Sequence, residues 1–271
     1  MMQSRLEHAR NIAYQAGELT LRYFNNAEGL TIERKADESP VTIADRETEQ
    51  LLRQRIIEHF PDDAVFGEEF PPIDGTSGYR WILDPIDGTK TFICGVPLYS
   101  VLIGLEQDGR SVGGVIALPA LGELVWGGRG LGAWWETKQG EPKRCQVSQC
   151  SRLAEATFLT SEVLLFDQYK RREVYTLLEQ STRFTRTWGD AYGYTLIATG
   201  RADVIVDPAM AIWDAAPLLV ILEEAGGRFT DWKGNATIDG GDGVATNGRL
   251  HEAVLRCLDL ESGTVPCQPC P

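Results

Sequence analysis

Five short apolar runs follow one another between residues 80 and 136 of the chain. They are rich in Val, Ile, Leu and Trp, and turn residues such as the stretch QDGR separate them. Runs of this length and composition, bounded by turn residues, are typical of consecutive β-strands. This region therefore predicts an antiparallel meander, with strands at WILD, YSVLIGLEQ, SVGGVIALP, ELVWGG and GAWWE.

Helical spacing of apolar residues precedes the meander. It runs from Ser4 to Asn25 and again from Thr42 to Phe60, where Pro61 closes the second segment. Beyond about residue 150 the pattern alternates between strands and helices. Strands are predicted at ATFLT, ADVIVD, GRFTD and DGVAT, and helices at residues 167–180, at DAYGYTLIATG and at WDAAPLLVILEEAG.

This order of elements predicts an α+β fold made of packed layers, because alternating strands and helices suit a second layer of mixed sheet and helices. We expect an N-terminal subdomain over residues 1–150 and a C-terminal subdomain over residues 151–260, packed closely together. The tail, residues 261–271, is rich in Pro, Gly and Ser and is expected to be a flexible end.

The composition excludes several classes of partner. A formal net charge of −13 repels nucleic acid backbones, and a chain this acidic needs bound cations to handle an anionic substrate. No apolar run approaches the roughly 20 residues of a membrane span, and the N-terminus lacks the apolar core of a signal peptide. We therefore expect a cytoplasmic protein with no nucleic acid or membrane partner.

The six cysteines are spaced irregularly, which favours reduced thiols over a disulfide framework. Cys145 with Cys150, or Cys267 with Cys270, could form half of a zinc site, although the spacing between the two pairs is loose. Cys94 is expected to be a small buried apolar residue.

The stretch WILDPIDGTKTF places two aspartates three residues apart at the end of an apolar run. With Pro85 fixing the backbone, Asp84 and Asp87 can point into one pocket together with the carbonyl of Ile86. Three hard oxygen donors of this kind suit Mg²⁺ or Mn²⁺. Gly88 and Thr89 can open a helix whose free N–H groups attract an anion, so this pair is a candidate phosphate-binding site.

Two further acidic features accompany this stretch. FGEEF places Glu68 and Glu69 after a glycine, and IWDAAP places Asp214 at the head of an apolar helix. Other interpretations remain open, because an exposed turn can use Asp84 and Asp87 to cap a helix, and Asp214 can serve as an N-cap.

Together these stretches resemble a known family. The combination of GEE, WILDPIDGT and WDAAP with a following EAGG is similar to the inositol monophosphatase family of Mg²⁺-dependent, lithium-sensitive phosphatases. The resemblance extends from Ala9 to about Ala245. It implies the layered αβαβα sandwich of that family and a homodimer.

The resemblance also implies roles for individual residues. The metal ligands would be Glu68, Asp84, the carbonyl of Ile86, Asp87 and Asp214, which together bind two or three Mg²⁺ ions, with Mn²⁺ as a substitute. Thr89 and Asp45 would hold the attacking water, and Glu68 would lie next to it. Lys35 matches a family lysine near the active site, but Glu38, Ser39 and Pro40 depart from the family pattern beside it.

This layout suits hydrolysis of a phosphate monoester by in-line attack of water. The dianionic ester repels hydroxide, so cations are needed to neutralise the phosphoryl oxygens and to lower the pKa of a water molecule. No covalent enzyme intermediate is required. The three histidines, at positions 8, 59 and 251, show no partner pattern and are expected to be helix-surface residues.

The second half of the chain resembles the histidinol-phosphate phosphatase branch more than the inositol branch, on the stretches WGDAYGY and ATGRADVIVDP. Histidinol phosphate carries an ammonium and an imidazole, so its pocket should offer extra carboxylates. Asp190 and Asp207 are the candidates, and Trp188 and Tyr192 could line the imidazole. The alternative interpretations are that Asp190 is an N-cap and that the two aromatic residues belong to the core.

Three functions are therefore considered. The leading hypothesis is a Mg²⁺-dependent histidinol-phosphate phosphatase of histidine synthesis. The alternative is an inositol monophosphatase or a broader sugar- or nucleotide-phosphate phosphatase on the same scaffold. The remote alternative is an inactive metal-binding regulatory subunit, which the complete set of expected ligands disfavours. Arg186 and Arg201 could reach substrate phosphate across a subunit boundary or be surface charges.

Overall fold

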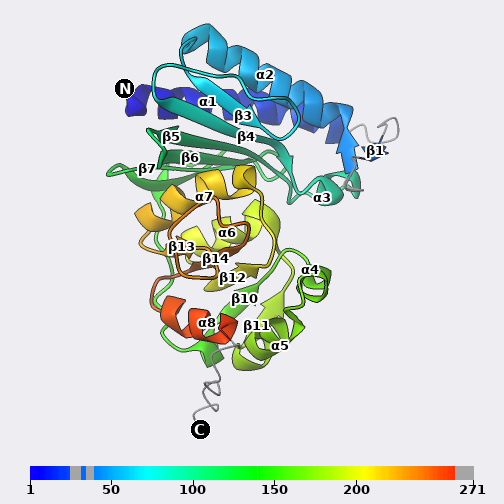
Figure 1. Cartoon of the computed structure of the whole chain (residues 1–271), viewed down its shortest axis with the longest axis vertical. Helices are drawn as coiled ribbons and strands as arrows, with labels where there is room; N and C mark the ends of the chain where they lie inside the picture. Colours follow the sequence, from blue (N-terminus) through cyan, green and yellow to red (C-terminus); the bar gives the residue numbers. More distant parts are fainter. Residues whose placement is uncertain (25–31, 35–39, 139, 260–271) are drawn as a thin grey trace.

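The computed structural model describes residues 1–24, 32–34, 40–138 and 140–259. Helices and sheets alternate through it in five layers, with two helices at one end and three at the other (Figure 1). This is the expected αβαβα sandwich. Within the described ranges, no helix combines the length and the apolar character that a membrane crossing requires.

The first layer consists of α1 (Met2–Phe24) and α2 (Ile43–His59), which confirms the two predicted N-terminal helices to within two residues at each end. Their apolar faces pack on one side of the first sheet, where Leu6, Ile12 and Leu52 meet Trp81 and Leu83 of that sheet. A short antiparallel pair, β1 (Ile32–Arg34) and β2 (Pro40–Thr42), lies between the two helices in sequence.

The first sheet has seven strands in sequence order. The predicted meander is confirmed, because the strands from β4 onward pair antiparallel. The first strand, β3, pairs parallel with β4 and was not predicted from the sequence. The strands are β3 (Ala64–Gly67), β4 (Tyr79–Asp87), β5 (Ser100–Gln107), β6 (Arg110–Leu118), β7 (Glu123–Gly128), β8 (Gly132–Thr137) and β9 (Lys143–Arg144).

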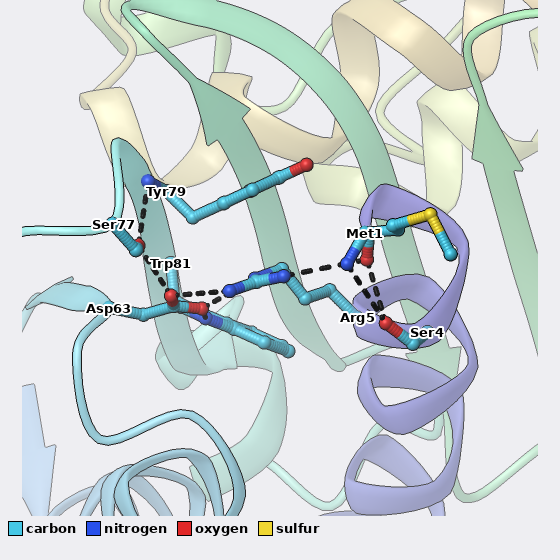
Figure 2. A network of polar contacts seen from close by, with 7 residues as sticks. All are labelled: Met1, Ser4, Arg5, Asp63, Ser77, Tyr79 and Trp81. Carbon is cyan, nitrogen blue, oxygen red and sulfur yellow. Dashed lines mark hydrogen bonds and ion pairs between the residues drawn. The ribbon is translucent and has the colours of Figure 1, made fainter.

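A buried ion pair fastens α1 to the β3–β4 edge of this sheet (Figure 2). Asp63, just before β3, accepts two hydrogen bonds from Arg5, at 2.6 and 2.7 Å. It also accepts from the Ser77 hydroxyl at 2.5 Å and from the Trp81 indole at 2.8 Å. The Arg5 guanidinium lies 3.8 Å from the ring centre of Tyr79, so the cation is covered by an aromatic face.

The middle layer consists of α6 (Asp190–Ala198) and α7 (Ile212–Glu224), between the two sheets (Figure 1). Glycines of neighbouring strands let α7 approach the first sheet closely. A Cβ atom at Gly104 would lie 2.4 Å from the Cβ of Ala216, and one at Gly114 would lie 2.5 Å from the carbonyl oxygen of Pro217. Gly104 and Gly114 are paired across β5 and β6. Together they leave a patch of the sheet without side chains, and α7 packs directly on this patch.

The second sheet has five strands in the order β11-β10-β12-β14-β13. The first three pair parallel, β14 pairs antiparallel with β12, and β13 pairs antiparallel with β14. The strands are β10 (Thr157–Leu159), β11 (Phe184–Arg186), β12 (Val204–Asp207), β13 (Arg228–Thr230) and β14 (Gly243–Thr246).

The last layer covers the outer face of the second sheet with α4 (Val163–Gln168), α5 (Arg172–Ser181) and α8 (His251–Leu258). The single helix predicted over residues 167–180 is wrong, because the chain turns between α4 and α5. Lys170 has φ of 57° there, a left-handed conformation that interrupts a helix.

Candidate active site

A cavity of about 560 Å³ lies where the N-terminal and C-terminal halves of the chain meet. Its walls come from the end of β4, from the short helix α3 (Thr89–Ile93), from the starts of α6 and α7, and from the end of β12. Residues from both sheets and from the middle layer therefore face one space. Most of the site residues expected from the sequence lie on its walls.

The centre of the cavity is an acidic cluster formed by Asp84, Asp87 and Asp214. One carboxylate oxygen from each lies within 4.8 Å of the other two. Asp84 and Asp87 end β4, where the pairing with β5 shifts register between them, next to Pro85. That irregularity lets two residues three apart face one pocket. Asp214 arrives from the first turn of α7.

Burial decides between the interpretations left open for these aspartates. Asp84 is 2% exposed and Asp87 is 8% exposed, so the exposed-turn interpretation is wrong. The N-cap interpretation of Asp214 is also wrong, because α7 begins at Ile212 and its N-cap is Ala211. The Asp214 carboxylate instead accepts the backbone N–H of Ala211 at 2.8 Å. This bond fixes the carboxylate at the head of the helix.

The cluster carries more negative charge than its surroundings neutralise. Burial and the negative charges of Glu68, Asp87 and Asp214 raise the pKa of Asp84 well above its usual value. Burial, followed by the charge of Asp214, raises the pKa of Asp87 to about 7, and burial likewise raises that of Asp214 to about 7. Within the described residues, no arginine, lysine or histidine forms an ion pair with any of the three.

This donor set fits a hard divalent cation. Carboxylate oxygens brought together without a positive side chain are the ligands that Mg²⁺ and Mn²⁺ bind, and they do not suit a soft metal. Asp87 is held in place by the Ser100 hydroxyl at 2.6 Å and by the Ala191 N–H at 2.8 Å. Since these bonds use one oxygen of Asp87, its other oxygen is left for a ligand.

Glu68 follows β3 and lines the same cavity. Its neighbour Glu69 donates a backbone N–H to the buried Glu49 of α2 at 2.7 Å, and Glu49 pairs with Arg53 at 2.7 Å. Arg53 in turn donates to the carbonyls of Phe70 and Pro71, both at 2.8 Å. The pair thus holds the loop that presents Glu68. The sequence analysis missed it, although Glu49 and Arg53 stand four residues apart on one helix face.

Thr89 and Gly88 lie on the cavity wall, and the predicted helix start is confirmed, because Gly88 is the N-cap of α3 with φ of 75°. The Thr89 hydroxyl donates to the carbonyl of Ile86 at 3.1 Å. Asp45 is not among the residues that line the cavity, and its carboxylate accepts the Thr42 N–H at 2.7 Å and the Thr42 hydroxyl at 2.6 Å at the start of α2. The roles of these residues in holding water or phosphate stay predictions.

Asp190 faces the cavity from the first residue of α6. Its N-cap interpretation is wrong, because Gly189 occupies that position. Asp190 has φ of 52°, which is strained for a residue with a side chain, and the Ser161 hydroxyl accepts its N–H at 2.8 Å. Its carboxylate accepts the Thr91 hydroxyl at 3.3 Å. Burial, together with the charges of Asp87 and Asp207, raises the pKa of Asp190 to about 7.

Asp207 ends β12 on the cavity wall, but its carboxylate is already occupied by four donors. They are the Ser161 N–H at 2.7 Å, the Tyr194 hydroxyl at 2.8 Å, and the hydroxyls of Thr160 and Ser161, each at 3.0 Å. Asp207 therefore braces the pocket wall. Contact between Asp207 and substrate stays a prediction.

The remaining sequence candidates lie elsewhere. Trp188 is 46% exposed, so its core interpretation is wrong, and it is not among the residues that line the cavity. Tyr192 packs against the central core, and Arg201 pairs with Glu123 at 3.5 Å. Lys35, Cys267 and Cys270 lie outside the described residues.

Two minor expectations are corrected. Cys94 is exposed rather than buried. His251 is fully buried rather than on a surface, with its ring nitrogens 3.0 Å from the Thr230 hydroxyl and 3.1 Å from the Thr246 hydroxyl, and burial lowers its pKa to about 4.

Several cavity residues were not found from the sequence. They are Ser161 after β10, Tyr194 in α6, and the ion pair between Lys90 and Glu162. Ser161 and Glu162 could have been identified, because they follow the predicted strand at ATFLT and the ends of strands in mixed α/β folds often carry ligand-binding residues.

Comparison with known proteins agrees with this geometry. The model of the inositol monophosphatase family matches residues 1–261. The histidinol-phosphatase of Chlorobaculum parvum is 45% identical over 89% of this chain and 91% of its own length, and that of Mycobacterium tuberculosis is 40% identical over 92% and 95%. The crystal structure of the extragenic suppressor protein suhB from Bartonella henselae superposes with a TM-score of 0.87 at 28% identity, over 95% of this chain and 99% of that one.

Proposed function

The chain belongs to the inositol monophosphatase family and is a phosphomonoester hydrolase, and we propose that its substrate is L-histidinol phosphate, hydrolysed to L-histidinol and phosphate with Mg²⁺. The observation that carries this proposal is the acidic cluster of Asp84, Asp87 and Asp214, which forms no ion pair with a positive side chain of the described residues and lies in a cavity that both halves of the chain line. The identity to two histidinol-phosphatases supports the choice of ester.

Glu68, Asp84, Asp87, Asp214 and the carbonyl of Ile86 are the proposed ligands of two or three Mg²⁺ ions, with Mn²⁺ as a substitute. Bound Mg²⁺ would neutralise charge on the phosphoryl oxygens and lower the pKa of a water molecule for in-line attack. The protein contributes the fixed positions of these oxygens, since the N–H groups of Ile86, Ala191 and Ala211 each hold one carboxylate.

Thr89 is proposed to orient the attacking water. Its hydroxyl proton is already donated to the carbonyl of Ile86, so the hydroxyl oxygen can accept a hydrogen bond from water. Asp45, which accepts two hydrogen bonds from Thr42 at the start of α2, is proposed to help hold the same water. Gly88 and Thr89 at the start of α3 are the proposed contacts for the phosphoryl oxygens.

Asp190 is proposed to recognise the positively charged part of the substrate. Its carboxylate lines the cavity and receives one hydroxyl hydrogen bond at 3.3 Å, which leaves acceptor capacity for an ammonium or imidazole N–H. A neutral polyol ester supplies no such cation. Lys35 and Trp188 remain proposed substrate contacts from the sequence alone.

Inositol 1-phosphate, or a broader range of sugar and nucleotide phosphates, is the alternative substrate class, because the same cluster would serve any phosphate monoester. The inactive regulatory subunit is disfavoured, since Glu68, Asp84, Asp87 and Asp214 are present and share one cavity. We further propose a lithium-sensitive homodimer in the cytoplasm, as expected from the sequence.

The test is phosphate release by the purified protein with Mg²⁺, comparing L-histidinol phosphate, inositol 1-phosphate, fructose 1,6-bisphosphate and 3′-phosphoadenosine 5′-phosphate at equal concentrations. Preference for L-histidinol phosphate that EDTA abolishes is the expected result. Metal-dependent preference for another ester would overturn the choice of substrate and leave the metal site intact. Activity that EDTA does not change would overturn the metal site.

Asp190→Asn tests the recognition step separately. We expect about a tenfold loss of kcat/KM with L-histidinol phosphate and a smaller loss with inositol 1-phosphate, because only the first substrate loses a charged hydrogen bond. Equal losses on both esters would assign Asp190 to the structure of the pocket.

A further inference from the structure

An ion pair crosses the mouth of the cavity between the two halves of the chain. Lys90, the second residue of α3, lies with its Nζ 2.6 Å from Oε2 of Glu162. Both side chains line the cavity. Glu162 occupies the N-cap position of α4, yet its side chain makes no capping hydrogen bond to that helix. Its carboxylate is therefore directed to the cavity rather than to its own helix.

The charges around the cavity are unequal. Seven carboxylates line it, and among the described residues Lys90 is the one positively charged side chain that does so. Four of the seven are the proposed metal ligands, and Asp207 is occupied by four donors. Asp190 and Glu162 remain. Of these two, only Glu162 forms an ion pair with an ammonium group within the part of the chain that the structure describes, so its surroundings accept that kind of ligand.

Separating Glu162 from Lys90 costs little free energy, so another cation can take the place of Lys90. The side chain of Lys90 is 69% exposed and that of Glu162 is 35% exposed. Ion pairs this accessible to water contribute little to stability, because hydration compensates each charge when the pair separates. A ligand that is held in the cavity at its phosphate end presents its own ammonium at high local concentration, which favours it over the flexible lysine side chain.

We propose that Glu162 is a specificity-determining residue that binds the ammonium group of the substrate in exchange for Lys90. After the exchange, the Lys90 ammonium lies near the anionic phosphate ester, and the opposite charges attract each other. A neutral polyol phosphate offers no cation for the exchange and leaves the resting pair in place. This inference rests on the proposed function, since it assumes an ester that carries an ammonium group.

The experiment compares two substrates on one variant. L-histidinol phosphate carries the ammonium, and 3-(imidazol-4-yl)propyl phosphate is the same ester without it. In Glu162→Gln we expect the ratio of KM for L-histidinol phosphate to KM for the analogue to rise about tenfold, because the variant loses a charge-assisted hydrogen bond to the first substrate only. The analogue thus separates recognition of the ammonium from any general effect on the cavity.

Asp167→Asn is the matched control. Asp167 lies on the same helix, α4, pairs with Arg172 at 3.2 Å and is not among the cavity-lining residues. We expect this variant to leave the KM ratio unchanged. A thermal unfolding curve for each variant checks that the fold is retained, which the exposure of both ion pairs favours.

The possible failures are distinguishable. If the wild-type protein turns over L-histidinol phosphate but Glu162→Gln leaves the KM ratio unchanged, or raises both KM values equally, the inference is wrong and the proposed function stands. If the wild-type protein prefers another ester and does not hydrolyse L-histidinol phosphate, the proposed function fails and the inference fails with it.

Discussion

Two sites in this protein contain buried carboxylates, one with and one without an ion-pair partner among the described residues. The first is Asp63 between α1, α2 and β4 (Figure 2), and the second is the acidic cluster of Asp84, Asp87 and Asp214. Asp63 lies just before β3, Asp84 and Asp87 end β4 of the same sheet, and Asp214 belongs to α7. Asp63 and Asp84 are each 2% exposed. Burial alone therefore cannot account for their different properties.

Asp63 is fully satisfied by the chain itself. Burial raises the pKa of Asp63, but hydrogen bonds from Arg5, Ser77 and Trp81 more than offset this and bring the pKa below its usual value. In the acidic cluster the neighbours are other carboxylates, so burial and like charge act together and the pKa values rise. The comparison distinguishes a carboxylate that an arginine of the chain neutralises from carboxylates that repel one another, as expected for the proposed metal ligands.

The largest expected effect is on activity, in Asp84→Asn. We expect about a thousandfold loss of kcat/KM, because the variant loses a proposed metal ligand at the centre of the site. The metal-free variant should be at least as stable as the wild type, since one of several repelling charges is removed. Steady-state kinetics and urea unfolding in EDTA measure the two effects, and a variant that is active but less stable would contradict the assignment.

Asp63→Asn should behave in the opposite way. It leaves the Arg5 guanidinium buried without its anion, and breaking a buried pair costs about 3–5 kcal/mol of the free energy of unfolding. The activity of the folded variant should be close to that of the wild type, because Asp63 does not line the cavity. Urea unfolding and kcat at a temperature below the transition measure both. A loss of kcat comparable to that of Asp84→Asn would contradict the assignment of Asp63 to stability and of the acidic cluster to activity.

The stability of the metal-free protein should also depend on pH with opposite signs at the two groups. Unfolded aspartates titrate near 3.8, and the folded-state pKa values of Asp87 and Asp214 are about 7. Between these values the folded protein binds more protons than the unfolded chain, so the free energy of unfolding should fall as pH rises from about 4 to 7. Asp63, with its lowered pKa, contributes stability above about pH 4 that is lost as pH falls further.

Unfolding in EDTA at several pH values between 4 and 8 measures this dependence. Adding Mg²⁺ at pH 7 should recover stability, by about 2.7 kcal/mol at a hundred times its dissociation constant. In Asp84→Asn the decrease between pH 4 and 7 should be smaller. A free energy of unfolding that rises over this interval in the wild type would show that the cluster is ionised without penalty.

The smallest expected effect is on the Mg²⁺ dependence of activity, in a variant of Glu49. This residue forms a buried ion pair and also holds the loop of a proposed metal ligand. It is buried and paired with Arg53 like Asp63 with Arg5, but it holds the loop that carries Glu68. In Glu49→Gln we expect the Mg²⁺ concentration for half-maximal activity to rise about tenfold, as for other residues that position ligands, with kcat at saturating Mg²⁺ retained.

Glu58→Gln is the control for this effect, since Glu58 is an exposed residue of the same helix paired with Arg55 at 3.0 Å. If Glu49→Gln lowers activity equally at every Mg²⁺ concentration, Glu49 does not act through the metal site.

The sequence predicted those parts of the protein whose signals are local. Asp84 and Asp87 could be placed at a strand end from a dozen residues, and Gly88 could be placed at a helix start, because strand and helix periodicities are properties of short segments. The order of helices, meander and alternating elements predicted a second layer of mixed sheet and helices, and the resemblance to a known family implied the full αβαβα sandwich. The stretch around Asp214 predicted a helix from Trp213, and the observed helix begins one residue earlier, at Ile212.

Only the tertiary structure decided how residues distant in the chain share hydrogen bonds and charges. Lys90 and Glu162 are 72 residues apart, and Asp87 holds the N–H of Ala191 across 104 residues. No local spacing encodes these pairs, because each depends on how both sheets pack against α6 and α7. The same packing places four hydrogen-bond donors around Asp207 and an arginine beside Asp63. It places the carboxylates of Asp84, Asp87 and Asp214 next to one another. Identical side chains therefore acquire different protonation and different roles from the groups that the fold places around them.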